Sequence, residues 1–183
     1  FNAWAKYPDW QRDNAVAARV ARRHGYRRFP VTHRKRPVVL EGGGLDVNGR
    51  GTLLTTEECF LDQVVQCRNP GFTREDLDTV FASYFGAPNV LWFGRGIAGD
   101  DTHGHVDDLC RFVGPRTVVL VEEKNPADAN YRPLAENWER VKDMRLEDGS
   151  RLEAVPLPMP APLLFDGQRL PASYANFLIA NAA

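Results

Sequence analysis

Apolar residues along the chain follow two different spacings, one typical of strands and one typical of helices. Short apolar runs of strand length occur at 37–40, 52–56, 89–93, 117–121, 151–157 and 173–180. Apolar residues recur at helical spacing between Pro8 and Gly25, between Thr73 and Gly86, and over 125–144. Because strand-length runs alternate with helical stretches, the sequence predicts a mixed α/β fold.

Turn and capping residues mark the ends of several of these elements. Asn48-Gly49 interrupts the apolar pattern of 45–56, and both residues tolerate the positive φ of a tight hairpin turn. Gly114-Pro115-Arg116 predicts a second hairpin within 111–121. Thr73 and Asp76 have the spacing of a helix capping box, with aspartate in place of the usual glutamate or glutamine.

Two segments of the chain align at a constant offset of 65 residues. GRGTLLTTEE at 49–58 and GPRTVVLVEE at 114–123 share a glycine, a threonine, an apolar run and two final glutamates. An offset of this size holds one ββαβ unit, so the sequence predicts a repeat architecture in which each helix covers one face of its sheet.

The same offset relates three polar residues that are distant in the sequence. The offset of 65 residues aligns Glu41 with Val106, which lies between His105 and Asp107 in the sequence. Equivalent elements of successive units therefore carry Glu41, His105 and Asp107. If the units circle a pseudo-symmetry axis, we expect these three side chains to converge on it.

Length and composition predict part of a single domain. A chain of 183 residues with 43% hydrophobic side chains can bury a substantial core. The offset carries Thr117 onto Ala182, so the third unit's second hairpin strand would begin just where the sequence stops. The chain opens on Phe1, without a methionine. We therefore expect residues 1–183 to form one partial domain, truncated at both ends.

Charge and cysteine content exclude several classes of protein. The net charge is −1 and no long block of lysine or arginine is present, which argues against nucleic-acid binding. No run of eighteen apolar residues or signal peptide is visible, so no membrane association is expected. Three cysteines without C-x-x-C spacing suit a reducing compartment, and we expect a cytoplasmic location.

Residues 100–108 gather four aspartates and two histidines, which suit a metal site, an acid–base site for a cation, or a solvated loop. His103, His105 and Asp107 match the H-x-H-x-D core of metallo-β-lactamase-like hydrolases, in which imidazoles and a carboxylate bind zinc. Such sites draw more histidines from downstream, and no histidine follows His105. A truncated metal hydrolase is therefore an alternative interpretation.

Several motifs, taken in order, cover the whole chain. They are FNAW at 1–4, LEGGG at 40–44, GTLLTTEEC at 51–59, RNP at 68–70, DDTHGHVD at 100–107 and ANFLI at 175–179. Together they resemble the agmatine deiminase and bacterial-type peptidylarginine deiminase family. The resemblance implies an α/β propeller of ββαβ repeats with five-fold pseudo-symmetry, of which this chain would contain about two to three units.

The resemblance also implies a reaction and roles for three residues. Members of the family hydrolyse a guanidinium group through a cysteine thiolate, without a cofactor, and we expect agmatine to yield N-carbamoylputrescine and ammonia. His105 matches the acid–base histidine, Asp107 the aspartate that holds the guanidinium nitrogens, and Glu41 the glutamate that supports the histidine and the cationic site. The choice between agmatine and peptidyl arginine stays open, as does assembly into a homo-oligomer.

The chain departs from the family pattern at the nucleophile. The family's glycine-rich motif with the catalytic cysteine is absent, and so is the Arg-Asp segment with its other substrate aspartate. We interpret Cys59, Cys67 and Cys110 as structural. The fragment alone is therefore expected to be inactive, and a noncatalytic protein on the same scaffold is a further alternative. The other histidine and aspartates of the 100–108 cluster are expected to shape the loop or to supply a negative field that favours a cation; they are His103, Asp100, Asp101 and Asp108.

Overall fold

Six strands form two three-stranded sheets of the same design. The structure is a computed structural model that describes residues 1–180. In each sheet the first two strands are antiparallel, and the third runs parallel to the central strand. The first sheet contains β3 (Asp46–Val47), β4 (Thr52–Thr56) and β5 (Asn89–Phe93), and the second contains β6 (Cys110–Phe112), β7 (Thr117–Glu122) and β8 (Glu153–Pro158).

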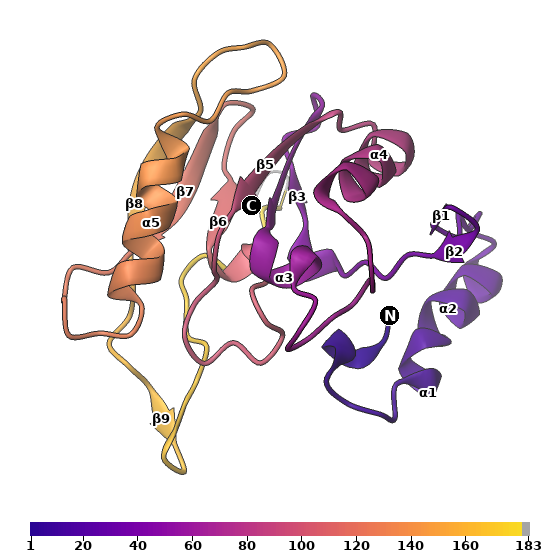
Figure 1. The fold of residues 1–183 in the computed structure, drawn as a ribbon, viewed down its shortest axis with the longest axis horizontal. Helices are drawn as coiled ribbons and strands as arrows, with labels where there is room; N and C mark the ends of the chain where they lie inside the picture. The colour runs from indigo at the N-terminus through magenta and orange to yellow at the C-terminus, as the bar shows by residue number, and fades with distance from the viewer. Residues whose placement is uncertain (181–183) are drawn as a thin grey trace.

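A long helix connects the second and third strands of each sheet. α4 (Arg74–Phe85) joins β4 to β5, and α5 (Tyr131–Val141) joins β7 to β8; each packs against its own sheet (Figure 1). The predicted capping box is confirmed, since the side chains of Thr73 and Asp76 each accept the backbone N–H of the other residue. Two ββαβ units therefore follow one another, as the offset of 65 residues predicted.

The two units meet through equivalent positions. β3 and β6 lie side by side, and Arg111 Nε on β6 is 3.4 Å from the Asp46 carboxylate on β3. These two residues are related by the same offset of 65. The Asp46 carboxylate also accepts the backbone N–H of Phe112 at 2.6 Å. Just before the two strands, the short 3₁₀ helices η2 (Gly42–Gly44) and η3 (Val106–Asp108) pack together in the same way.

β4 contributes to the core of both units. Successive side chains of a strand point to opposite faces, so Leu53 packs with Phe81 of α4 while Leu54 packs with Leu120 and Leu134 of the second unit. Every residue of β4 is buried. Burial on both faces explains why its sequence is an almost continuous apolar and threonine run without polar alternation.

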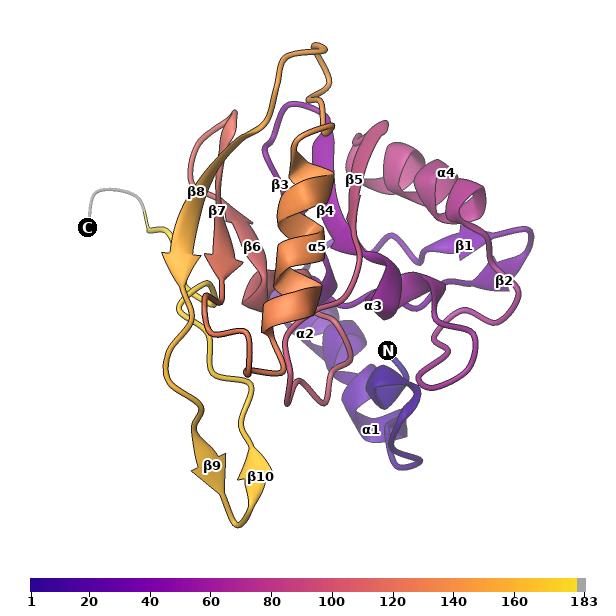
Figure 2. The ribbon, with the colours of Figure 1, turned by 60° about the vertical axis from the view of Figure 1, so that its left-hand side comes forward.

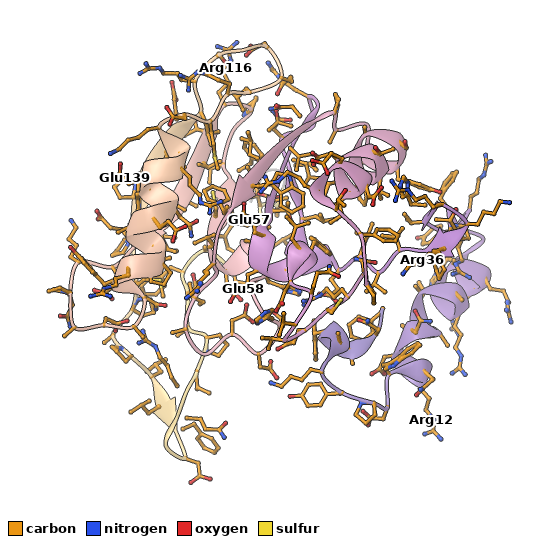
Figure 3. The ribbon with its side chains drawn as sticks, in the orientation of Figure 1. Arg12, Arg36, Glu57, Glu58, Arg116 and Glu139 are labelled. Atoms are coloured by element: carbon orange, nitrogen blue, oxygen red, sulfur yellow. The ribbon has the colours of Figure 1, made fainter. Side chains whose placement is uncertain are left out.

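Shorter elements surround the two units, and Figure 2 shows the β9–β10 hairpin extending away from them. They are η1 (Ala3–Ala5), α1 (Gln11–Asn14), α2 (Val16–His24), the hairpin of β1 (Thr32–His33) and β2 (Arg36–Pro37), α3 (Glu57–Leu61), and the hairpin of β9 (Leu164–Phe165) and β10 (Gln168–Arg169). Figure 3 places Arg12 and Arg36 on the N-terminal flank, across the molecule from Glu139 on α5. Within residues 1–180, no helix has the length and apolar character that crossing a membrane requires.

Two of the three predicted helices are shorter in the structure than expected. The helix expected before Gly25 is broken at Ala15 into α1 and α2, although it ends at Gly25 with φ of 70° as predicted. The helix expected over 125–144 begins only at Tyr131. The side chains of Asn125 and Asp128 accept backbone N–H groups two residues ahead, and these turns compete with the first helical turns.

Two strand predictions were wrong, because side chains take the backbone groups that a neighbouring strand would pair. Of the strand predicted over 37–40, only Pro37 lies in a strand, β2. At 38–40, the Asn69 amide accepts the N–H of Val39 and donates to its carbonyl. At 173–180 no strand forms, and Arg111 instead donates to the carbonyl of Phe177. The β9–β10 hairpin was not predicted. The third-unit strand expected from Ala182 lies outside the described residues.

Candidate active site

The two 3₁₀ helices bring one candidate residue from each unit together. Glu41 immediately precedes η2, and His105 immediately precedes η3. The Nε2 atom of His105 lies 2.7 Å from a carboxylate oxygen of Glu41, whose residue is only 7% exposed. These side chains are 64 residues apart in the sequence, and the contact between the units is what joins them.

Two threonines at the end of β4 hold the segments that carry this pair. The Thr55 hydroxyl donates to the carbonyl of Gly44 in η2 at 2.9 Å, and the Thr56 hydroxyl donates to the carbonyl of Gly104 at 2.5 Å. Thr56 also caps α3 by accepting the N–H of Cys59. One strand end therefore positions both the Glu41 segment and the His105 segment.

Asp107 faces the same space as His105. A Cβ atom built on Gly43 would lie 2.4 Å from His105 Nδ1 and 2.9 Å from Asp107 Oδ2, so both side chains reach the bare backbone of this glycine. Asp107 Oδ1 is buried without a hydrogen-bond partner among the described residues. Burial raises the pKa of Asp107, partly offset by the nearby His105 and Arg111. The site thus contains a carboxylate oxygen that has no hydrogen-bond donor within residues 1–180.

Glu41 is an anion in spite of its burial. Burial by itself raises its pKa, but hydrogen bonds from His105 and Arg68 outweigh that effect and hold the pKa below its usual value. Arg68 Nε donates to both Glu41 oxygens, at 2.8 Å and 2.9 Å. A charged acceptor is therefore fixed against one nitrogen of His105.

Sequence reasoning assigned no role to Arg68, although RNP was one of the motifs. Arg68 is 2% exposed and also donates to the backbone carbonyls of Cys59, at 3.1 Å, and of Thr102. An arginine is almost never fully buried without a partner, but the sequence does not show which residues are buried. Nothing in the spacing of Arg68 pointed to Glu41, 27 residues earlier.

Asp100 and Asp101 make hydrogen bonds to different parts of the chain. The Asp100 carboxylate accepts the backbone N–H groups of Thr102, Gly104 and His105, and so folds the loop that presents His105. Asp101 points outward and accepts from the Tyr7 hydroxyl at 2.6 Å. The loop-shaping role expected of Asp100 is thus observed, whereas Asp101 attaches the N-terminal segment.

The metal site that the alternative interpretation of H-x-H-x-D requires is not formed within the described residues. His103 Nε2 lies 2.5 Å from the Asp62 carboxylate, whereas His105 is held by Glu41, so different carboxylates bind the two imidazoles. Within residues 1–180, the only group of three or more His, Cys, Asp and Glu residues whose ligand atoms all lie within 4.8 Å of one another is Glu41, Cys59 and His105. The interpretation that joined His103 and His105 with Asp107 is therefore wrong.

The cluster of Glu41, Cys59 and His105 is also poorly suited to a metal. The guanidinium of Arg68 already occupies both oxygens of Glu41 and supplies the positive charge that a metal would bring. Burial raises the pKa of the Cys59 thiol far above its usual value, and a thiol must lose its proton to ligate a metal. The geometry is instead that of an Arg68–Glu41 ion pair whose carboxylate also binds His105.

The interpretation of the three cysteines as structural stays a prediction, which their burial supports. Cys59 and Cys110 are buried, Cys67 is partly buried, and all three are free thiols. Burial raises the pKa of each thiol, which disfavours the thiolate that a nucleophile requires.

The segment after His105 forms a tight turn. Val106–Asp108 forms η3, and the N–H of Leu109 donates to the carbonyl of Val106. Asp108 nevertheless points away from His105, because its carboxylate accepts from the Asn176 side chain at 3.1 Å. Burial raises the pKa of Asp108 to about 6. The turn and not strand alternation therefore separates Asp107 from Asp108.

We expect Gly43→Ala to damage the site and Gly42→Ala to leave it intact. An added methyl at Gly43 would overlap His105 Nδ1 and Asp107, whereas one at Gly42 meets no atom within 4 Å. Displacing two reactive groups by about 1 Å should lower kcat/KM about 10- to 100-fold in the complete protein. Steady-state kinetics of both variants checks this, and equal activities would show that Gly43 does not border the reacting groups.

Comparison with known proteins identifies relatives over the whole chain. A profile of the Porphyromonas-type peptidyl-arginine deiminase family matches residues 1–183. A protein of Legionella pneumophila, provisionally named an agmatine deiminase, is 35% identical over 181 residues, which are 98% of this chain and 50% of that protein. The chain thus spans about half the length of the curated relatives that it matches.

Solved structures of relatives share the fold. A cysteine-to-serine variant of the C. jejuni agmatine deiminase, with substrate bound, is 32% identical and superposes with a TM-score of 0.86 over 100% of this chain and 51% of that one. The agmatine deiminase of Enterococcus faecalis is 30% identical, with a TM-score of 0.83 over 99% of this chain and 54% of that one. The mixed α/β architecture is therefore that of deiminase structures.

Proposed function

The chain belongs to the Porphyromonas-type peptidyl-arginine deiminase family, and on that premise we propose that it carries part of a site that hydrolyses a guanidinium group. The expected reaction converts agmatine and water to N-carbamoylputrescine and ammonia through a cysteine thiolate. The chain covers about half of its relatives, so the proposal concerns the complete protein. The thiolate would come from outside residues 1–183, and no cofactor takes part.

The observation that carries this proposal is the Asp107 oxygen beside the His105–Glu41 pair, for which the described part of the chain offers no donor. A buried carboxylate oxygen without a donor is costly, and a ligand with fixed N–H groups would satisfy it. A guanidinium is planar, permanently charged and rich in donors, and it pairs with a carboxylate through two parallel hydrogen bonds. Its charge would also favour the ionised form of Asp107, whose pKa burial raises.

His105 is placed for proton transfer through its Nδ1 atom. The Glu41 carboxylate only accepts hydrogen bonds, so the facing Nε2 of His105 carries a hydrogen. Nδ1 lies on the side of Gly43 and Asp107, where the substrate would bind. The thiolate attacks the guanidinium carbon, His105 gives a proton to the departing ammonia, and it then takes one from the water that releases the ureido product.

We also propose that these residues are part of one deiminase domain built as a closed propeller of five ββαβ units. The support is that two units with identical strand order meet through equivalent positions, such as Asp46 and Arg111. A third unit would meet the second in the same way: the Ser173 hydroxyl donates to the carbonyl of Asp108, and these residues are again 65 apart.

The proposal is tested by assaying the complete protein with agmatine and with a peptidyl-arginine substrate in the presence of a chelator. We expect ammonia and the ureido product to form without added metal, and the preferred substrate identifies the class. Activity that a chelator abolishes and zinc restores would contradict the proposal. Absence of turnover with both substrates would favour the noncatalytic interpretation.

A further inference from the structure

We propose that Arg68 is a positioning residue of this site, which locks Glu41 against His105 and ties both to the loop that precedes His105. The inference rests on the proposed function, because it concerns the same site. Arg68 lies in the segment between α3 and α4, outside both 3₁₀ helices that carry Glu41 and His105. It is therefore a second connection, besides the end of β4, between the segments that carry Glu41 and His105.

The guanidinium of Arg68 joins three separate segments. Its Nε atom donates to both oxygens of Glu41, one terminal nitrogen donates to the carbonyl of Cys59 on α3, and the other donates to the carbonyl of Thr102. The side chains of Arg68 and Glu41 are 0% and 4% exposed. A planar group with donors on three edges can make this set of bonds, whereas a lysine ammonium cannot span it.

The hydrogen bonds of the Arg68–Glu41 pair also fix the position of His105. One Glu41 oxygen accepts from both Arg68 and His105, so the position of the imidazole depends on where Arg68 holds the carboxylate. Thr102 lies three residues before His105, and its carbonyl is fixed by the same guanidinium. Moving Arg68 would shift the imidazole through its partner and through its own loop.

Arg68 also controls the charge of Glu41. The charged and titratable groups facing Glu41 are Arg68, His105 before η3 and the Cys59 thiol on α3, and Asp100 adds a negative charge near Arg68. Burial opposes the ionised form of Glu41, and the bonds from His105 and Arg68 counteract it. Without Arg68, the pKa of Glu41 should rise, and His105 would then lose its anionic partner at a higher pH.

The test compares Arg68→Met and Arg68→Lys in the complete protein, with Arg140→Met as the matched control. Arg140 pairs with Glu57 and Glu136, which are not part of the site. We expect Arg68→Met to lower kcat/KM roughly 10- to 100-fold, as loss of an orienting partner does elsewhere, and to move the acid limb of its pH profile upward. Arg68→Lys should keep the acid limb near that of the wild type but lose rate, and Arg140→Met should change neither.

A second measurement does not depend on turnover. Carboxyl ¹³C NMR of labelled glutamate, assigned with Glu41→Gln, follows the ionisation of Glu41, and we expect its midpoint to rise in Arg68→Met and to recover in Arg68→Lys. An unshifted midpoint together with wild-type kcat/KM would overturn the inference. If Arg68→Met does not fold, a well-folded Arg68→Lys with wild-type kcat/KM overturns it and a tenfold loss supports it. Absence of turnover in the wild type would refute the proposed function, and the NMR midpoint would still decide the role of Arg68.

Discussion

Replacing His105 with glutamine in the complete protein should lower kcat/KM by about 10³-fold, within the range that general acid–base catalysis contributes. A glutamine amide can still donate to Glu41, which accepts from His105 Nε2 at 2.7 Å in the wild type. It cannot exchange a proton with ammonia or water, because an amide does not titrate near neutral pH. The measurement is the kcat/KM of purified, folded variants with the preferred guanidinium substrate.

His103→Asn is the matched control for this prediction. His103 is in the same loop and is also bound to a carboxylate, but that carboxylate is Asp62 and not Glu41. Its φ is 65°, a conformation that asparagine adopts more readily than most residues, so the loop should keep its path. We expect less than a tenfold change. Equal losses in both variants would show that the loop conformation, and not proton transfer by His105, limits the rate.

Asp107→Asn should cost about 10²- to 10³-fold or more in kcat/KM. The substitution keeps the shape of the side chain, replaces one acceptor oxygen by a donor and removes the charge. If Asp107 holds the substrate, a buried guanidinium loses its counter-ion, and breaking such a pair costs about 3–5 kcal/mol. The loss should therefore exceed the effect of any surface substitution, which is about 0.5 kcal/mol.

Asp108→Asn is the matched control, because it makes the same chemical change at the next residue. Asp108 points toward Asn176, away from His105, and should change the rate by less than about tenfold. A larger loss for Asp108 than for Asp107 would show that Asp108 is the residue that faces the substrate. Circular dichroism of both variants establishes that each is folded.

Asp108→Asn should also change how stability depends on pH. Burial raises the pKa of Asp108 in the folded protein to about 6, above its value in an unfolded chain. The stabilisation from the protonated form is therefore present at low pH and is lost as the pH rises through about 6. Because the amide does not ionise, the variant should gain stability over the wild type near neutral pH but not at about pH 4, which thermal denaturation measures.

The local elements that the sequence predicted correctly have their causes within a few residues. The turn at Asn48-Gly49 needs positive φ, and Gly49 has φ of 71°. The start of α4 follows from the reciprocal bonds of Thr73 and Asp76. The offset of 65 residues predicted the two units because each must bury the same sheet face under its own helix.

The features that sequence reasoning missed depend on distant partners. The apolar run at 38–40 has the pattern of a strand, but the amide of Asn69 pairs with Val39 where a neighbouring strand would. The residue types from His105 to Asp108 are compatible with both a turn and a strand, so the sequence alone does not predict η3. The position of Arg68 is visible only when three segments come together around it. Glu41 and His105 were found because the repeat relates them.

The ion pair between Asp46 and Arg111 restricts the order in which the units can stand. These residues occupy the same place in two copies of one unit, so an unaltered duplicate would face aspartate with aspartate at this contact. Two carboxylates would repel each other here, because the Asp46 side chain is only 16% exposed. Arginine in the second copy replaces that repulsion with attraction. Repeating the first unit in place of the second by protein engineering should therefore weaken this contact unless the aspartate is changed with it.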